Sequence, residues 1–364
     1  MNERELLIYL HSLNGVGIKS LSKLVTNLPT LSTVLQLQPL ELSIQAGVDF
    51  SIAQKIIDGC NETAIKQFFS KYQDWLRSGV EVVTIYDQAY PYLLKEIPDP
   101  PLVIFGIGEL ELLQKPAVAI VGTRSPTSYG RYAAEVLAKE LTEYGLTIVS
   151  GLAKGVDRLA HEGALKAVGK TVAVLGCGVD VIYPLENMKL YQQIIQQGLI
   201  ISEYPPGTKA HPGFFPQRNR IISGMAYGTI VVEAAERSGS LITAQAALEQ
   251  AREVFAVPGP INSKKSQGVN SLIQQGAKLI QNGADVVEEL PYLNLTKKTS
   301  AKSSINLSKV EEAVFSQIQF VPIHTDELYD KLPLNLTNIY EALLSLQIKG
   351  KIKQLPGGLY IREV

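Results

Sequence analysis

The feature that most limits the fold is a series of six short apolar runs, rich in β-branched residues, in the middle of this 364-residue chain. Most of these runs alternate with segments whose apolar residues recur at helical spacing. Strands that are apolar along their whole length and separated by helices are typical of a parallel sheet covered on both faces. The sequence therefore predicts an α/β domain. The six runs are residues 117–121, 147–149, 171–175, 199–202, 229–232 and 254–257.

The two ends of the chain have different patterns. Residues 1–80 contain short blocks of apolar residues at spacings of three and four, broken by glycine and proline, which predicts small packed helices. Near the other end, three helical patterns precede a hairpin signal at Pro356-Gly357-Gly358, an order that suits a winged helix. We therefore predict four parts: a helical domain (1–80), an α/β domain (81–292), a polar linker (293–304) and a winged helix (305–364).

Helix patterning supports separate folding of the last part. Apolar residues at helical spacing predict one buried face on each of two of its helices. The first predicted face consists of Val310, Ala313, Val314 and Ile318, and the second of Ile339, Leu343, Leu344 and Ile348.

Composition excludes several classes of protein. Hydrophobic residues make up 46% and charged residues 19%, which rules out a disordered or collagen-like chain. The net charge of -1 means that binding to a nucleic acid must come from local charge rather than from the total. Cys60 and Cys177 lie far apart with no ligand at metal-binding spacing, so we expect neither a disulfide framework nor a metal site.

The compartment follows from the same cysteine usage and from the amino-terminal residues. The first ten, MNERELLIYL, carry two acids and lack the apolar core and cleavage site of a secretion signal. No apolar run approaches about eighteen residues, so we expect no membrane-spanning helix. A reducing, cytoplasmic location is the expectation.

Small residues follow several predicted strands and lead into helices. Gly122-Thr123-Arg124-Ser125 and Ser150-Gly151 follow two strands, and Ser238-Gly239-Ser240 opens a later helix. Free backbone N–H groups and the helix dipole favour an anion at such positions. Each loop alone is equally well explained as a tight turn, but several at one sheet edge predict a phosphate-bearing ligand.

Two nucleotide-binding motifs are only partly present in the sequence. Gly169-Lys170-Thr171 resembles the end of a P-loop, but the first glycine is replaced by Ala164 and a strand follows instead of a helix. Gly176-Cys177-Gly178 begins a dinucleotide fingerprint, yet Val181 stands at the third glycine position. We expect no ATP or dinucleotide cofactor. The four histidines are scattered, and no catalytic set can be assembled from the spacing.

Three stretches lack acidic residues and carry several basic ones: residues 112–134, 204–232 and 254–284. The second contains Phe214 and Phe215 beside Arg218-Asn219-Arg220, and aromatic rings beside guanidinium groups suit unpaired bases and their phosphates. Core packing is an equally good explanation for each phenylalanine alone. Together the stretches predict a basic cleft.

The residues between the first two predicted helices, Leu13-Asn14-Gly15-Val16-Gly17-Ile18, form a Gly-x-Gly hairpin. Exposed amides in such a hairpin can receive a phosphodiester. A tight turn without a ligand explains the same pattern.

At these residues the sequence strongly resembles the DNA-processing protein A family, also called DprA or Smf. The blocks lie in the family's order and cover most of the α/β domain. They are AIVGTRSPTSYG (119–130), IVSGLAKGVDRLAHEGAL (148–165), LIISEYPPGT (199–208), FPQRNRIISG (215–224), EAAERSGSLITA (233–244), VPGPINSKKSQGVNSLIQQGA (257–277) and, at the end, PGGLYIRE (356–363).

The resemblance implies an extended Rossmann domain, flanked by a helical domain related to helix-hairpin-helix or SAM modules and by a winged helix. It implies a non-enzymatic protein of natural transformation that binds and protects single-stranded DNA. It also implies help in loading the recombinase RecA, and self-association through the Rossmann domain.

The resemblance also implies a set of DNA-binding residues. Several relatives carry a lysine where this chain has Pro212, and Lys209 is the candidate to supply that charge. The implied site comprises Gly122, Thr123, Arg124, Ser125, Ser150, Gly151, Phe215, Arg218, Asn219, Arg220, Ser238, Gly239 and Ser240, with Lys209 added.

Two other functions compete. The same Rossmann variant occurs in phosphoribohydrolases of nucleotide monophosphates, whose PGGxGTxxE loop supplies a catalytic acid. Here the corresponding stretch, beginning at Glu233, reads EAAERSGS and lacks that pattern. A winged-helix transcription regulator is disfavoured because residues 301–364 hold seven basic and seven acidic side chains.

Overall fold

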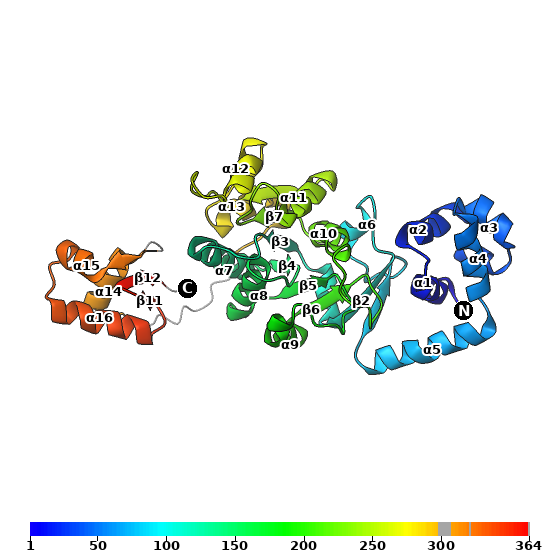
Figure 1. The fold of residues 1–364 in the computed structure, drawn as a ribbon, viewed down its shortest axis with the longest axis horizontal. Coiled ribbons are helices and arrows are strands. Elements are labelled where there is room, and N and C mark those ends of the chain that lie inside the picture. Colours follow the sequence, from blue (N-terminus) through cyan, green and yellow to red (C-terminus); the bar gives the residue numbers. More distant parts are fainter. Residues whose placement is uncertain (298–306, 320–321, 363–364) are drawn as a thin grey trace.

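The computed structural model describes residues 1–297, 307–319 and 322–362. A helical unit, a large α/β unit and a small mixed unit follow one another along the molecule in chain order (Figure 1). Most of the predicted linker, residues 298–304, lies outside the described residues.

The α/β unit is built on a nine-stranded sheet with the order β1-β2-β6-β5-β4-β3-β7-β8-β9. The six predicted runs correspond to β3 to β8, all parallel to one another, so the α/β prediction is confirmed. The strands are β1 (Glu81–Thr84), β2 (Val103–Gly108), β3 (Ala117–Val121), β4 (Thr147–Ser150), β5 (Thr171–Leu175), β6 (Leu199–Ser202), β7 (Gly228–Val231), β8 (Glu253–Ala256) and β9 (Lys278–Leu279).

The pairing of the first two strands departs from the parallel pattern. β1 pairs antiparallel with β2, and β2 pairs antiparallel with β6. The connection between β1 and β2 holds only the single-turn helix α6 (Tyr92–Lys95) and several prolines. It therefore contains no crossover helix of the kind that a parallel pair requires.

Helices cover both faces of this sheet (Figure 1). One buried cluster joins α7, α8 and α13 to the sheet, and another joins α10, α11 and α12 to the opposite face. These helices, with α9, are α7 (Ser128–Glu143), α8 (Val156–Lys166), α9 (Met188–Gln197), α10 (Phe214–Gly224), α11 (Gly239–Glu249), α12 (Gln267–Gln274) and α13 (Gly283–Glu288). Short 3₁₀ turns lie at Leu110–Gln114, Leu185–Asn187 and Pro291–Leu293.

The strand order reverses next to β3. From β3 the chain adds β4, β5 and β6 on one side, and then crosses to add β7, β8 and β9 on the other. The loops that leave the carboxyl ends of β3 and β7 therefore diverge, which opens a crevice at this switch point.

The amino-terminal unit consists of helices, as predicted. A single buried cluster runs from its helices into the sheet, where the Trp75 and Phe105 rings pack edge to face at 5.6 Å. Arg4 also pairs with Asp87 at 2.9 Å. The helices are α1 (Glu3–Ser12), α2 (Ile18–Asn27), α3 (Pro39–Ala46), α4 (Phe50–Gly59) and α5 (Glu62–Arg77), with a 3₁₀ turn at Leu31–Leu35.

The carboxy-terminal unit has the helices and the hairpin of a winged helix, as predicted. Its three strands have the order β10-β12-β11. The elements are α14 (Lys309–Gln317), β10 (Ile323–His324), α15 (Thr325–Lys331), α16 (Leu336–Ile348), β11 (Ile352–Leu355) and β12 (Leu359–Arg362).

One predicted face in this unit is wrong. Ile339 and Leu343 are buried, but Leu344 and Ile348 are 60% and 79% exposed. The core instead receives Ala342 and Leu346 from α16. This helix has apolar residues on both of its faces, so periodicity alone could not decide which face is buried.

Across the parts of the chain that the structure describes, no helix has both the length and the apolar character needed to cross a bilayer.

Candidate nucleic-acid interface

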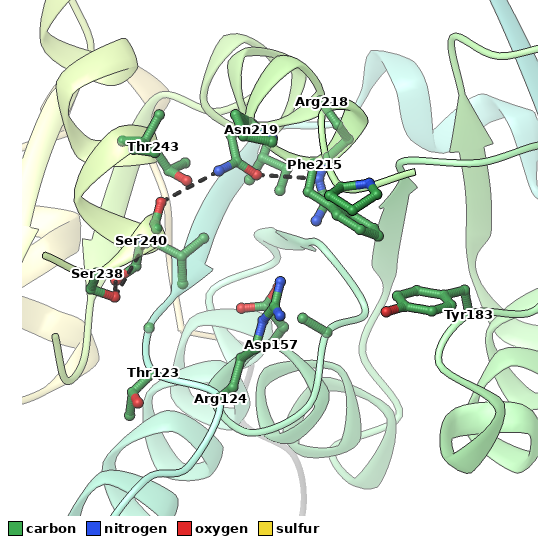
Figure 2. A pocket seen from close by; sticks show the side chains of 18 residues that line it. Thr123, Arg124, Asp157, Tyr183, Phe215, Arg218, Asn219, Ser238, Ser240 and Thr243 are labelled. Carbon is green, nitrogen blue, oxygen red and sulfur yellow. Dashed lines mark hydrogen bonds between the residues drawn. The ribbon is translucent and has the colours of Figure 1, made fainter. Parts of the chain in front are cut away.

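An open cavity of about 440 Å³ lies at the switch point of the sheet (Figure 2). We call it the switch-point cleft. Its walls come from the loop after β3, the start of α8, the amino-terminal half of α10 and the loop that opens α11. Three predicted segments and the start of α8, which are far apart in the sequence, therefore meet at one cavity.

The loop after β3 forms one wall. A side chain at Gly122 would place its Cβ only 2.7 Å from Cγ2 of Val156, so glycine is needed for the loop to pack against α8. The Thr123 amide donates to the Glu233 carbonyl at 2.7 Å, which ties this loop to the segment after β7. Arg124 is exposed and presents its guanidinium group to the cleft.

Aromatic rings form the opposite side. Phe215, at the start of α10, stacks with Tyr183 at a centroid distance of 5.3 Å and an interplanar angle of 26°. The Arg124 guanidinium lies 5.9 Å from the centre of the Phe215 ring. A cation beside stacked rings at the rim of an open cavity offers contacts to both a phosphate and an unpaired base.

Arg218 lies in the floor of the cleft and is only 4% exposed. Its Nη1 donates to the Gly151 carbonyl at 2.7 Å and to the Val174 carbonyl, at the ends of β4 and β5. Burial lowers the pKa of this guanidinium, and the nearby Asp157 carboxylate opposes that shift. Arg218 thus holds the floor together and adds positive potential from below.

Asp157 is the acidic group of the cleft. Burial raises the pKa of its carboxyl, and the charge of Arg218 and the backbone N–H groups of Ala153 and Gly151 act against that rise. The side chain lies beside Arg124 in Figure 2.

The loop that opens α11 completes the cleft. Ser238 caps the helix, and its hydroxyl lies 2.8 Å from that of Ser240. Asn219 of α10 donates to the Gly239 carbonyl at 3.4 Å, which bridges the two walls (Figure 2). The helix start provides hydroxyl and amide donors of the kind that bind phosphate oxygens.

The structure brings most of the predicted residues together. Those that line the switch-point cleft are Gly122, Thr123, Arg124, Phe215, Arg218, Asn219, Ser238, Gly239 and Ser240. Gly151 lines a smaller extension of about 60 Å³ beside it.

Four predicted residues do not line the cleft. Ser150 is buried below it and donates to the Ile120 carbonyl at 2.6 Å. Ser125 lies just outside, where its carbonyl accepts a hydrogen bond from Lys265. Lys209 lies exposed in the loop before α10. Arg220 faces away and pairs with Glu203 at 2.6 Å and Asp99 at 3.2 Å.

Sequence reasoning missed Tyr183 and Asp157. Tyr183 follows the Gly176-Cys177-Gly178 loop by five residues, and an aromatic residue soon after a glycine turn at a strand end is the signal that could have found it. Asp157 has the appearance of an ordinary helix-start acid, and nothing in the sequence separates it from a cap. In the described part of the chain, no three His, Cys, Asp or Glu side chains gather to hold a metal ion.

The fold and the site together define a Rossmann-like α/β protein with an open, arginine-bearing and aromatic-lined cleft at its switch point. The family described as DNA recombination-mediator protein A matches residues 81–291, and the DprA winged helix domain matches residues 298–358. The chain belongs to this family.

Curated relatives agree with this assignment. The chain is 46% identical over 236 residues to the DNA processing protein DprA of Bacillus subtilis, a match that covers 64% of this chain and 80% of that one. It is 34% identical to the protein Smf of a Synechocystis species, a match that covers 96% of each chain.

Two solved structures are similar. The DNA processing protein A of Streptococcus pneumoniae aligns with a TM-score of 0.69 and 37% identity, over 79% of this chain and 98% of that one. The protein of the same name from Helicobacter pylori, whose structure is described for its single-stranded DNA binding mode, aligns with a TM-score of 0.53. That match has 35% identity and covers 59% of this chain and 98% of the other.

Proposed function

We propose that this protein is a non-enzymatic, single-stranded DNA-binding protein of natural transformation. It protects incoming strands and helps to load the recombinase RecA onto them. The α/β domain, residues 81–292, carries the DNA site, with Lys209 and the residues of the switch-point cleft as its contacts. The helical domain (1–80) and the winged helix (305–364) flank it.

The observation that carries the proposal is the arrangement of Arg124, Phe215 and Tyr183 at the rim of the cleft. A base of a duplex is already stacked and paired, so rings at the rim of an open cavity favour a strand whose bases are free. The donors at the start of α11 and the Arg124 guanidinium suit the backbone phosphates of that strand.

The test is a titration with matched single-stranded and duplex oligonucleotides at two salt concentrations. We expect the single strand to bind more tightly, with an affinity that falls steeply as salt rises because phosphate contacts release counterions. Equal affinity for the duplex, or no salt dependence, contradicts the proposal.

The absence of catalysis is part of the proposal. Glu233 begins the stretch that corresponds to the catalytic loop of the phosphoribohydrolases, and it is 3% exposed. Its two carboxylate oxygens accept hydrogen bonds from the amide and hydroxyl of Thr127 at the start of α7. That arrangement suits a structural role. Release of a base from nucleotide monophosphates that stops in Glu233→Gln would instead support the phosphoribohydrolase alternative.

The partners follow from the family resemblance. We propose that two copies associate through the Rossmann domain and that the protein acts in the cytoplasm. Ile261 after β8 is 93% exposed and Leu279 in the edge strand β9 is 42% exposed, so this side of the sheet has apolar surface to bury.

Two measurements test these partners. Sedimentation should show a dimer, and RecA should coat single-stranded DNA faster when the protein is present. A monomer at every concentration, or an unchanged RecA rate, contradicts the corresponding part.

A further inference from the structure

A second, larger cleft lies on the other side of α10. One side of α10 faces the switch-point cleft with Phe215, Arg218 and Asn219. The other side faces a cavity of about 800 Å³ with Phe214, Gln217 and Arg220, which follow one another at a spacing of three residues. The far wall of that cavity is the hairpin between α1 and α2. We call it the hairpin cleft.

The hairpin presents a helix start to this cleft. α2 begins after Gly17, and no side chain caps its first turn, so its first N–H groups have no helical acceptor. A Cβ at Gly17 would meet no atom within 4 Å, which shows that the approach to these amides is open. Lys19, in the first turn, also lines the cleft and is exposed.

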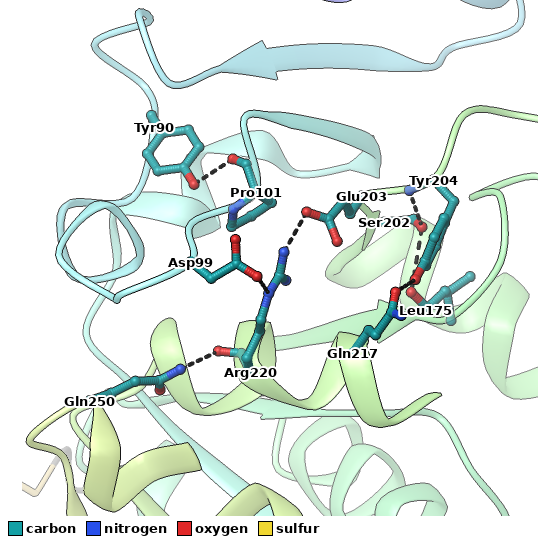
Figure 3. Close-up of polar contacts among 10 residues, drawn as sticks. All are labelled: Tyr90, Asp99, Pro101, Leu175, Ser202, Glu203, Tyr204, Gln217, Arg220 and Gln250. Atoms are coloured by element: carbon teal, nitrogen blue, oxygen red, sulfur yellow. Dashed lines mark hydrogen bonds and ion pairs between the residues drawn. The ribbon is translucent and has the colours of Figure 1, made fainter. Parts of the chain in front are cut away.

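Independent evidence for a ligand comes from the wall opposite the hairpin. Glu203 is 1% exposed, and Arg220 binds only one of its two carboxylate oxygens (Figure 3). Two residues of this wall each have a buried atom with no partner among the described residues, Glu203 Oε2 and Arg220 Nη1, and so does His11 Nδ1 in α1 on the hairpin side; all three residues line the cleft. Buried polar groups are rarely left unpaired, because a buried donor or acceptor without a hydrogen bond destabilises the fold.

An aromatic platform stands beside these atoms. The rings of Tyr204 and Phe214 stack at a centroid distance of 4.2 Å and an angle of 24°, and both residues line the cleft. The Tyr204 hydroxyl lies 3.1 Å from Gln217 Oε1, which fixes the ring (Figure 3).

We propose that the hairpin cleft is a second nucleotide-binding groove, in which a base stacks on the Tyr204–Phe214 pair and a phosphate binds the start of α2. The unpaired acceptor of Glu203 and donor of Arg220 offer complementary contacts to the edge of that base. This inference rests on the proposed function, because the occupant we assign is the same DNA strand continuing across α10 from the switch-point cleft.

The charges of the cleft fit this division. Asp99 and Glu203 both pair with Arg220, so one positive charge offsets only part of two negative ones, and this wall suits a base better than a phosphate. The cationic Lys19 and the positive end of the α2 dipole lie on the hairpin side, where a phosphate is favourable.

The experiment compares short single strands, which fill only the switch-point cleft, with longer ones. We expect Lys19→Glu to weaken binding of the long strand about tenfold and to leave the short strand unchanged. Lys66→Glu is the matched control: it makes the same charge change on α5, in an exposed pair with Glu62. Long strands that carry iodouracil should also cross-link to Tyr204 or Phe214 under ultraviolet light.

Free nucleotides share the same chemistry, so a second titration uses a deoxynucleoside monophosphate alone. If the monophosphate gives a heat of binding with the parent protein and none with Lys19→Glu, the occupant is a free nucleotide. No such heat, together with the dependence on strand length, makes it the strand.

The groove itself is overturned if Lys19→Glu and Phe214→Leu both match the parent on long strands and the monophosphate gives no Lys19-dependent heat. The proposed function fails separately, if the parent protein does not bind short single strands.

Discussion

The switch-point cleft and helix α16 of the winged helix differ in the chemistry they expose. The cleft presents a guanidinium group beside stacked rings. By contrast, α16, whose counterpart reads the major groove in helix-turn-helix proteins, exposes an apolar stripe at a spacing of four: Leu336, Tyr340, Leu344 and Ile348.

The lysine next to α16 does not give this helix a free positive charge. Lys349, just after α16, pairs with Glu311 at 2.6 Å, and this contact is the main reason that the pKa of the Glu311 carboxyl falls to about 2. A fold that often binds DNA here exposes a surface suited to protein, while the proposed DNA site lies at the sheet edge. Function follows the side chains of a site rather than the fold that carries it.

The largest expected effect is on the stability of the α/β unit in acid. His161 is fully buried, and Thr171 Oγ1, which donates to the Ile148 carbonyl, lies 2.6 Å from its Nδ1. Nδ1 must then be the donor to Thr171. Burial, aided by the charge of Arg218, lowers the pKa of His161 from 6.5 to about 3, and burial lowers that of His11 to about 4.

Because these histidines are neutral when folded, the unfolded chain binds more protons below pH 6.5. The contribution of these histidines to the free energy of unfolding is fully present above pH 6.5. It falls as the pH drops towards 4, by roughly 1.4 kcal/mol per pH unit for each histidine. Urea unfolding followed by circular dichroism should show this slope, reduced in His161→Asn. The same slope in that variant and the parent would remove His161 as a cause.

The next effect separates the two regions directly. Arg124→Ala should weaken single-strand binding by about 2 kcal/mol, roughly thirtyfold, because a charged hydrogen bond and a contact to the Phe215 ring are lost. Fluorescence anisotropy with a labelled oligonucleotide measures it. Arg158→Ala, which removes an exposed arginine paired with Glu162 on α8, serves as the control. An unchanged affinity in Arg124→Ala would place the site elsewhere.

A smaller effect is expected from removal of the winged helix. A chain that ends at Thr299 should keep single-strand affinity within about threefold, since the switch-point cleft lies wholly before residue 244. A loss of about a hundredfold, roughly 2.8 kcal/mol, in a truncated protein that is still folded would move the main DNA site into the winged helix.

The smallest effect is expected from the stripe on α16. Leu344→Glu adds a charge to a side chain that is already 60% exposed, so neither stability nor DNA binding should change measurably. Thermal unfolding and the same anisotropy titration measure both. A weaker affinity for single strands in this variant would show that α16 contacts the DNA, and the contrast between the regions would then disappear.

Parallel strands could be predicted because strands buried on both faces leave apolar runs without alternation, and β3 to β8 are of this kind. β1 and β2 were not among the predicted runs: β1 has only four residues at the edge of the sheet, and the six residues of β2 include two glycines that interrupt its apolar pattern. Loops that end neighbouring parallel strands must meet at one edge, so Gly122, Arg124 and Ser238 could be assigned to a common site.

The side of a helix that faces the cleft was harder to predict. Arg218 and Arg220 are two residues apart, a spacing that turns them to opposite sides of α10, but nothing in the sequence tells which of them faces the cleft. Tyr183 reaches the site only through the path of its loop, and that path depends on tertiary packing.

Glu233 has a consequence for binding. Its carboxylate holds the start of α7 through Thr127, and its carbonyl accepts the amide of Thr123, so the two diverging segments at the switch point are fastened to each other. Walls joined in this way lose little conformational freedom when a ligand arrives. The entropy lost on association therefore falls mainly on the flexible strand, and differences in affinity between sequences should reflect how readily each strand gives up its own stacking.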